Sequence, residues 1–296
     1  MGESHPESPD RLTAIYSNLE DLIDSHKLFQ QEPLQADAEL IQLAHQHGMV
    51  EHIFNLSPCE GYVVIDPDTQ MNAHSLKAAR LAAGAGISAL QLIEDETQKS
   101  KQAFCLTRPP GHHAEHNRAM GFCLFNNIAI TAIYAAQNLN YNKILIIDFD
   151  VHHGNGTEDI VKGHPNISLI SSFQHPWYPG SGVPAQSSNI FNFPLYAGSG
   201  SEVIGQLWRD QIIPITRRIA PDLILVSAGF DAHQEDPLAQ LNFLDEDYFF
   251  FGKTLAQLAN EFCNGKVISF LEGGYQLDAL ARSVRAYIQG QLSESR

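Results

Sequence analysis

The stretch Lys143-Ile144-Leu145-Ile146-Ile147-Asp148-Phe149-Asp150-Val151-His152 joins an apolar run to a group of polar side chains. The run does not alternate between apolar and polar residues, so it is typical of a strand that helices cover on both faces of a parallel sheet. We therefore predict a buried strand over residues 143–149, with chemically active side chains at its carboxyl end.

Similar short apolar or β-branched runs alternate with longer stretches of helical spacing along the chain. This order predicts a doubly wound α/β domain. Residues 9–25 and 37–46 also read as helical, but no strand is evident near them. Strands are predicted over residues 61–65, 103–107, 143–149, 166–173, 222–227 and 266–271, and helices over residues 72–92, 124–138, 201–219, 245–262 and 277–289.

Composition limits the classes of function. The 296 residues carry a formal net charge of -16, which opposes binding to nucleic acid or an anionic membrane and favours cationic substrates. An excess of acidic residues that serves only solubility is an equal alternative. Four separated cysteines without a CxxC pair, and no signal peptide or membrane span, favour a reducing, cytoplasmic location. No repeat or linker divides the chain, so we expect one domain over residues 1–296.

The segment that follows the central run predicts a metal site. Asp148, Asp150 and His152 occupy alternate positions, so an extended backbone directs them to one side. A catalytic zinc ion takes three protein ligands, and Asp231 at the end of the 222–227 run is the best further candidate. A DxH pattern alone also fits a turn or a helix N-cap.

Two histidines, His112 and His113, follow another predicted strand in a turn that contains Pro and Gly. An imidazole beside a metal-bound water can act as a general base, and a carboxylate partner tunes its pKa. Asp148 and Asn155 are the natural partners of the two histidines. Because these partners differ in charge, we expect the pKa values of the two imidazoles to be pushed apart.

Aromatic side chains near glycines are candidates for the walls of a binding site. Tyr275 follows Gly273-Gly274 after the last apolar run, where its hydroxyl could stabilise an oxyanion. Gly121-Phe122 and Trp177-Tyr178 could line a channel. A plain turn, or packing in the core, is the alternative for each of them.

Several long motifs occur in the order found in histone deacetylases, and the chain resembles that family, in particular its class II members and the bacterial deacetylase-like amidohydrolases. The resemblance extends from His5 almost to the C-terminus. It implies an arginase-like three-layer α/β fold with a mainly parallel eight-stranded sheet. The motifs are RPPGHH, GFCLFNN, DFDVHHGNGT, GFDAH and EGGY.

The resemblance assigns roles to the candidate residues. It implies that Asp150, His152 and Asp231 bind Zn²⁺, although Fe²⁺ would fit the same three ligands. It makes His113 the general base with Asn155 as its partner, pairs His112 with Asp148, and makes Tyr275 the group that polarises the acetyl carbonyl. Phe122 and Tyr178 would line the acyl-lysine tunnel beside Gly121. A structural K⁺ ion, held by backbone oxygens near residues 148–152 and by a serine such as Ser171, is also implied.

Related sequences have a strand and a loop before the segment that matches His5. This chain begins Met1-Gly2-Glu3-Ser4. Either its start lies elsewhere or the protein manages without that edge strand, and in the second case we expect exposed backbone groups at one edge and an altered rim of the substrate entrance.

The activity implied is hydrolysis of an acetylated lysine in a protein or peptide, giving acetate and a free amine. An acetylpolyamine deacetylase is the nearest alternative, and Leu238, at a position where one polyamine-specific branch has Glu, argues modestly against it. An arginase-like ureohydrolase and a non-catalytic acetyl-lysine binder fit less well, because the ligand order indicates one metal ion and no expected catalytic residue is missing. The sequence leaves both a monomer and a homo-oligomer open.

Overall fold

The central apolar run forms strand β4 (Ile144–Asp148), in which all five residues are buried. The structure, a computed structural model, describes residues 2, 5–98 and 100–294. Its main sheet is parallel throughout, with the strand order β3-β8-β7-β4-β5-β6. The strands are β1 (Val63–Asp66), β2 (Thr69–Met71), β3 (Gln102–Cys105), β4, β5 (Ile167–Gln174), β6 (Ile190–Leu195), β7 (Leu223–Ala228) and β8 (Val267–Leu271).

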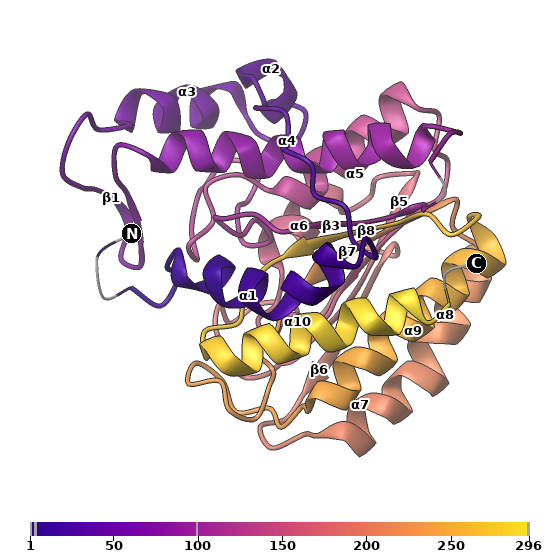
Figure 1. The fold of residues 1–296 in the computed structure, drawn as a ribbon. Coiled ribbons are helices and arrows are strands. Elements are labelled where there is room, and N and C mark those ends of the chain that lie inside the picture. The colour runs from indigo at the N-terminus through magenta and orange to yellow at the C-terminus, as the bar shows by residue number, and fades with distance from the viewer. Residues whose placement is uncertain (1, 3–4, 99, 295–296) are drawn as a thin grey trace.

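Helices cover both faces of this sheet, which gives the three-layer α/β arrangement that the sequence predicts (Figure 1). In Figure 1 the α2–α5 layer lies above the sheet and the layer with α1, α9 and α10 lies below it. The helices are α1 (Asp10–Asp24), α2 (Ala38–Ile41), α3 (His47–Leu56), α4 (Ser75–Glu94), α5 (Asn127–Asn138), α6 (Asn155–Val161), α7 (Ser201–Leu207), the π-helical turn η1 (Trp208–Ile212), α8 (Ile213–Ile219), α9 (Asp245–Phe262) and α10 (Leu277–Leu292).

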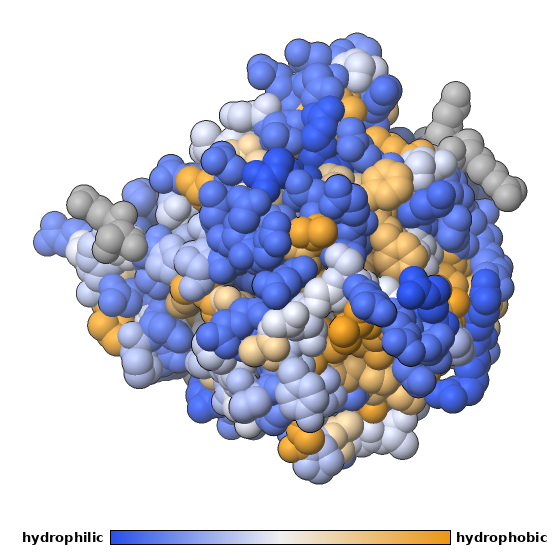
Figure 2. All heavy atoms as spheres, turned by 90° about the horizontal axis from the view of Figure 1, so that it is seen from below, coloured by the Kyte–Doolittle hydropathy of each residue, from blue (hydrophilic) through white to orange (hydrophobic). Residues whose placement is uncertain are grey.

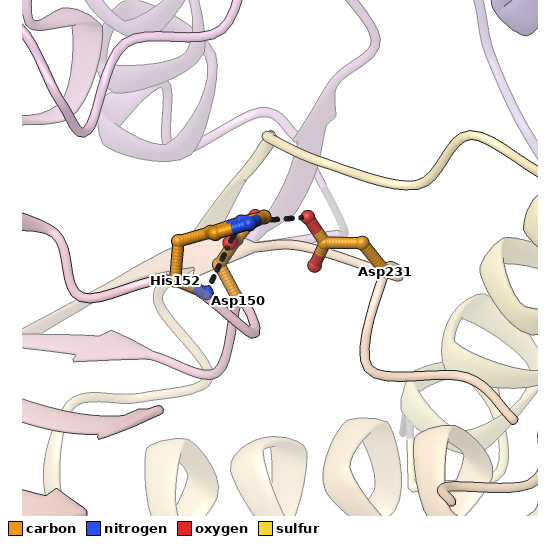
Figure 3. Close-up of side chains that lie close together, drawn as sticks. All are labelled: Asp150, His152 and Asp231. Atoms are coloured by element: carbon orange, nitrogen blue, oxygen red, sulfur yellow. Dashed lines mark hydrogen bonds and ion pairs between the residues drawn. The ribbon is translucent and has the colours of Figure 1, made fainter. Parts of the chain in front are cut away.

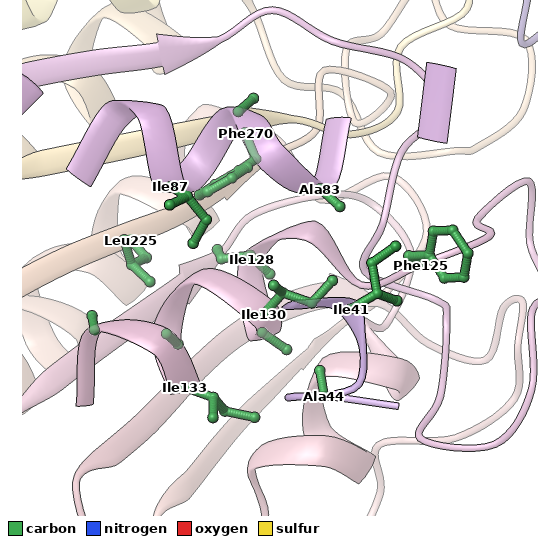
Figure 4. Packing of buried hydrophobic residues seen from close by; sticks show 14 of the residues in the cluster. Ile41, Ala44, Ala83, Ile87, Phe125, Ile128, Ile130, Ile133, Leu225 and Phe270 are labelled. Carbon is green, nitrogen blue, oxygen red and sulfur yellow. The ribbon is translucent and has the colours of Figure 1, made fainter. Parts of the chain in front are cut away.

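Successive residues of β4 belong to two different hydrophobic cores. Ile144 and Ile146 pack in the core under α4 and α5, part of which is drawn in Figure 4. Leu145 and Ile147 pack in the core formed with α1, α9 and α10. Because side chains alternate across a strand, a continuous apolar run is what two buried faces require.

The main sheet has six strands among the described residues, so the expected count of eight is wrong, although the predicted fold class is correct. The run at 61–65 supplies β1, which pairs with β2 in a separate antiparallel hairpin and leaves Val64 exposed. The expectation about the N-terminal edge falls partly on Met1, Glu3 and Ser4, which lie outside the described residues.

Four further elements differ from the prediction. Strand β6 contains Pro194, which normally argues against a strand, but β6 is an edge strand, where a missing N–H group is tolerated. Helix α6 begins in the polar segment that reads as a loop, and the helix expected over 37–46 ends at Ile41 before α3 begins. The helical stretch 201–219 contains a π-helical turn, η1.

Helices α9 and α10 cross at two glycines. A Cβ atom added to Gly252 would lie 2.0 Å from the Tyr287 carbonyl oxygen, and one added to Gly290 would lie 2.2 Å from that of Phe249. The two backbones therefore approach more closely than any larger residue would permit. Helix α1 lies along α10 on the same side, where the indigo and yellow helices are adjacent in Figure 1.

Figure 2 views the molecule from below and shows hydrophobic residues in small groups among hydrophilic ones on that face. Within the described part of the chain, no helix combines the length and apolar character that crossing a bilayer requires.

Replacing Gly252 with Ala should lower the thermal unfolding temperature, although Ala is the better helix former. The added methyl group would contact a backbone atom, and overpacking of this kind costs roughly 1–3 kcal/mol. The matched control is Gly48→Ala in α3, where a Cβ meets nothing within 4 Å and the change should be neutral or stabilising by up to about 1 kcal/mol. Equal unfolding temperatures for the two variants would contradict this account of the helix crossing.

Candidate active site

The register of the parallel strands brings the polar loops together. Asp148, the last residue of β4, pairs with Ser171 of β5 and Ser227 of β7. In the same register, Ala228 at the end of β7 pairs with Leu271 at the end of β8. The residues that follow β4, β7 and β8 therefore meet at the carboxyl ends of the strands, where open α/β domains bind ligands.

Asp150, His152 and Asp231 form a group that can hold a metal ion, and Figure 3 shows their side chains directed toward one another. One ligand atom from each residue lies within 4.8 Å of the others. The Nδ1 atom of His152 is 3.2 Å from Asp150 Oδ1 and 3.2 Å from Asp231 Oδ2. Both carboxylates are inaccessible to solvent, and only the His152 side chain is partly exposed, at 12%.

The surrounding backbone fixes this group. Val151 N–H donates to Asp231 Oδ1 and Gly273 N–H donates to Asp150 Oδ2. Asp231 Oδ2 is buried, and apart from its ion-pair contact with His152 Nδ1 it accepts no hydrogen bond from the described residues. An unsatisfied buried carboxylate oxygen is costly, so its environment suits a bound cation.

Glycines make this close packing sterically feasible. A Cβ atom at Gly229 would lie 2.0 Å from Asp150 Oδ2, and one at Gly273 would lie 1.9 Å from Asp231 Oδ2. Neither position can accept a side chain without moving a candidate ligand.

The charges in the group favour a cation. Burial alone would lower the pKa of His152, but Asp150 and Asp231 raise that pKa to about 10. Burial and the charge of Asp150 raise the pKa of Asp231. The site thus binds a proton tightly in the absence of metal, and a divalent ion would displace that proton from the imidazole.

The tandem histidines lie beside this group with different partners. His112 Nδ1 is 3.0 Å from Asp148 Oδ2, while His113 Nδ1 is 2.7 Å from Asn155 Oδ1. The two imidazole centroids are 4.1 Å apart. The structure therefore places each predicted partner beside its histidine.

The two imidazoles differ strongly in basicity. Burial opposes the charged form of His112, but the carboxylates of Asp150 and Asp148 raise its pKa well above the ordinary value. Burial and the nearby charges of His112 and His152 hold the pKa of His113 well below it. At neutral pH the site thus contains a cationic His112 and a neutral His113 that can accept a proton.

Three predicted aromatic side chains lie in this region: Tyr178 contacts the histidines, and Phe122 contacts Tyr275. The Phe122 ring lies 5.9 Å from the Tyr275 ring, and the Tyr178 ring lies 5.2 Å from His113 and 6.0 Å from His152. Phe122 has a φ of 67°, an uncommon conformation, and its N–H donates to Thr69 Oγ1.

The remaining predicted site residues are Gly121, Leu238 and Ser171. Gly121 allows its turn to approach His113, since a Cβ there would lie 2.6 Å from the imidazole Cδ2 atom. The Leu238 carbonyl oxygen accepts a hydrogen bond from the indole of Trp177, which neighbours Tyr178. Ser171 is buried beside Asp148, its pair on β5, and its hydroxyl has no hydrogen-bond partner among the residues described.

Sequence reasoning missed a set of buried charged residues that support the site. Glu272 accepts N–H groups of Gly111 and His112 through Oε2, and the Ser227 hydroxyl through Oε1. Burial raises the pKa of Glu272 to about 7. The motif that contains Tyr275 also contains Glu272, but nothing in its spacing indicates contact with the histidine turn.

Arg11 and Asp236 hold the backbone around Tyr275. Arg11 is buried, donates to the carbonyl oxygens of Gly274 and Glu272 at 2.6 and 2.5 Å, and lies 4.9 Å from the Tyr275 ring centroid. The Tyr275 N–H donates to Asp236 Oδ2. Burial raises the pKa of the Tyr275 hydroxyl well above its usual value, despite the opposing charge of Arg11, so the phenol stays protonated.

The sequence model of the histone deacetylase domain matches residues 5–291. The chain belongs to the histone deacetylase family. The match covers every residue of the site just described, and it supports a hydrolytic deacetylase activity.

Similarity to known sequences and to a solved structure extends over nearly the whole chain. The chain is 38% identical over 289 residues to an uncharacterised protein of Synechocystis, with 96% of this chain and 92% of the relative covered. It is 35% identical to "Histone deacetylase 14, chloroplastic" of Arabidopsis thaliana, covering 99% of this chain and 74% of the relative. A probable deacetylase of Methanothermobacter thermautotrophicus is 36% identical, with coverages of 97% and 86%. The crystal structure of the HDA15 HD domain matches with a TM-score of 0.90 at 34% identity, covering 100% of this chain and 84% of that one.

His45, which lies between α2 and α3, holds the backbone at Glu115 and Asn126. Because its ring is buried, we expect the stability of the protein to fall in acid. Its Nε2 accepts the Asn126 N–H, so its Nδ1 donates to the Glu115 carbonyl oxygen. Burial lowers the pKa of His45 from 6.5 to about 4. The unfolded chain therefore binds more protons below pH 6.5, and this histidine should reduce the free energy of unfolding by about 2 kcal/mol at pH 5 relative to pH 7.

Urea unfolding of the wild type and of His45→Gln, each at pH 7 and pH 5, measures this contribution. The wild type should lose more stability than the variant between the two pH values, because the other titrating groups are common to both. An equal loss in the two proteins would show that His45 does not become protonated on unfolding.

Proposed function

We propose that this protein is a zinc-dependent amidohydrolase that removes acetyl groups from lysine side chains in proteins or peptides. The main support for the proposal is that three metal-ligand candidates, a neutral histidine and a protonated tyrosine lie in one region together with aromatic side chains. Residues 1–296 would act as one catalytic domain. A cytoplasmic location stays a prediction.

Asp150, His152 and Asp231 would hold the metal ion. Their donors, one nitrogen and two carboxylate oxygens, suit zinc in a catalytic site, and they also suit Fe²⁺. The bound ion would act as a Lewis acid on the amide carbonyl and lower the pKa of a water molecule.

His113 would act as general base. It is neutral because its pKa is lowered, and the hydrogen bond from Nδ1 to Asn155 leaves Nε2 as the atom that accepts a proton from the attacking water. The same atom then delivers that proton to the departing amine. His112, kept cationic by Asp150 and Asp148, would stabilise the negative charge that develops beside it.

Tyr275 would donate a hydrogen bond to the carbonyl oxygen as that oxygen becomes negative. Its raised pKa favours this role, because a phenolate could not donate. The backbone contacts of Arg11 and Asp236 fix the tyrosine before substrate arrives, so no reorganisation is needed during the reaction.

The aromatic walls suit an extended alkyl chain. Phe122 and Tyr178 would contact the lysine methylenes, with Gly121 and Leu238 at their margins. The formal net charge of -16 attracts cationic amines, which also fits an acetylpolyamine substrate. A nonpolar Leu238 offers no charge to a second ammonium group, and this favours acetyl-lysine.

We also propose that a K⁺ ion binds near the 148–152 loop, beside Ser171. The buried Ser171 hydroxyl, which lacks a hydrogen-bond partner in the described structure, supports a cation at this position. Carbonyl oxygens of residues 148–152 would supply further ligands, as hard cations prefer oxygen.

Acetate release from an acetyl-lysine peptide, compared with acetylated putrescine and spermidine, tests the substrate class. We expect peptide turnover by the zinc-loaded wild type, and a loss of roughly 100-fold or more in kcat for Tyr275→Phe, since one oxyanion donor is worth about 3 kcal/mol. His113→Ala should also lose turnover. Preference for the polyamines would establish the alternative, and near-normal turnover by Tyr275→Phe would remove the proposed role of Tyr275.

Metal content provides a test that does not depend on activity. Chelator-treated wild type should regain about one zinc ion per chain, measured by elemental analysis, whereas Asp231→Asn should not. Zinc at a hundredfold excess over Kd should stabilise the wild type by about 3 kcal/mol in thermal unfolding. The exposed carboxylate variant Asp278→Asn serves as control and should behave like the wild type. Zinc uptake by Asp231→Asn equal to that of the wild type would contradict the assignment.

A further inference from the structure

Asn155 has a second hydrogen-bond partner on the side away from His113. Its Nδ2 atom is 2.7 Å from Oε1 of Glu115, and its Oδ1 atom is 2.7 Å from Nδ1 of His113. The two contacts use the two ends of one amide group, so the orientation of that amide connects Glu115 to the histidine.

The chemistry of Glu115 determines which end of the amide faces which partner. An ionised carboxylate accepts hydrogen bonds and donates none, so the atom beside Glu115 must be the amide nitrogen. The amide oxygen then faces His113. This oxygen only accepts, so Nδ1 of His113 must carry the proton.

The position of this proton decides whether His113 can act as a base. A neutral imidazole carries a proton on one nitrogen only, so protonation of Nδ1 leaves Nε2 with a free lone pair. Nε2 has no hydrogen-bond partner among the described residues. If the amide were reversed, its nitrogen would donate to Nδ1 and the imidazole proton would move to Nε2, which could then accept nothing.

The neighbouring groups hold Glu115 but do not replace it. Its carbonyl oxygen accepts from His45, its N–H donates to the Arg118 carbonyl, and Arg118 also pairs with its carboxylate. Met120 Sδ lies 3.4 Å from Asn155 Nδ2, but a thioether is a weak acceptor and cannot by itself fix the amide.

We propose that Glu115 is a positioning residue that sets the tautomer of His113 through Asn155. The proposal rests on the proposed function of His113 as a base, and it assigns a role to a side chain outside the metal group and the aromatic walls. The Glu115 side chain is 22% exposed and lines an outer cavity of about 410 Å³ with His116, Asp159 and Lys162. Its side-chain hydrogen bonds are to Asn155 and Arg118, not to the aromatic side chains of the site.

Charge reversal separates this role from a merely structural one. Glu115→Lys replaces an acceptor with a donor, which favours the reversed amide and hence the inactive tautomer. Adding Asn155→Asp to Glu115→Lys restores an oxygen toward His113 and an acceptor toward the lysine. Asn155→Asp alone places two carboxylates side by side, so it should be less active than the double variant. Glu115→Gln can still accept through its own amide oxygen.

Kinetics on the zinc-loaded protein with the acetyl-lysine peptide test these expectations. We expect Glu115→Lys to lower kcat by about 100-fold with little change in KM, because general-base catalysis of this size is removed while substrate contacts remain. Glu115→Gln should stay within about tenfold of the wild type. The double variant should recover at least about tenfold over Glu115→Lys. Lys162→Ala, which alters the same outer cavity, should match the wild type.

The ¹⁵N chemical shifts of His113 give a readout that does not depend on activity. With histidine-selective labelling, the wild type should show a protonated Nδ1, Glu115→Lys a protonated Nε2, and the double variant a protonated Nδ1 again. An unchanged tautomer in folded Glu115→Lys, or a double variant no more active than Glu115→Lys, would overturn the proposal. If the tautomer changes as expected but the wild type hydrolyses no acetylated amine, the proposed function fails while the positioning by Glu115 stands.

Discussion

Four carboxylates are almost completely buried at the carboxyl ends of the central strands: those of Asp148, Asp150, Asp231 and Glu272. Burial of so much like charge is unfavourable unless donors and cations surround it. The backbone supplies part of this compensation through N–H groups that donate to all four carboxylates, and His112 and His152 supply positive charge. The arrangement of the surrounding loops follows from this requirement.

The same requirement restricts the shape of the loops that carry the metal-ligand candidates. An N–H group can reach a buried carboxylate only if the backbone passes next to it, and at Gly229 and Gly273 any Cβ would overlap a carboxylate oxygen. The parallel register sets the distance between these loops before any side chain is placed. Rigid strands, two packed cores and glycine at the contact points thus preorganise the site.

The opposite pKa shifts of the two adjacent histidines follow from the charges around each ring: Asp150 and Asp148 raise the pKa of His112, whereas burial and the cationic His112 and His152 lower that of His113. The hydrogen-bond partner of His112, Asp148, carries a charge, while Asn155, the partner of His113, is a neutral amide. The Glu115 carboxylate, on the far side of Asn155, can then orient the Asn155 amide without placing its own charge against the His113 imidazole. The outer part of the network extends through Glu115 to the helical layer of α2 and α3, where His45 binds the Glu115 carbonyl oxygen.

The sequence by itself determined the buried central strand, the three-layer class and the residues of the metal group, because a doubly buried strand requires an unbroken apolar run and the polar residues directly follow such runs. It could not give the strand count of the main sheet, the edge strand that contains Pro194, or the supporting roles of Arg11, Glu115, Asp236 and Glu272. Arg11 and Gly274, for example, are separated by 263 positions. A charged residue is normally expected at the surface. Only the tertiary structure determines which groups surround such a residue and exclude water from it, so only the tertiary structure could decide that it is buried or hydrogen-bonded to the site.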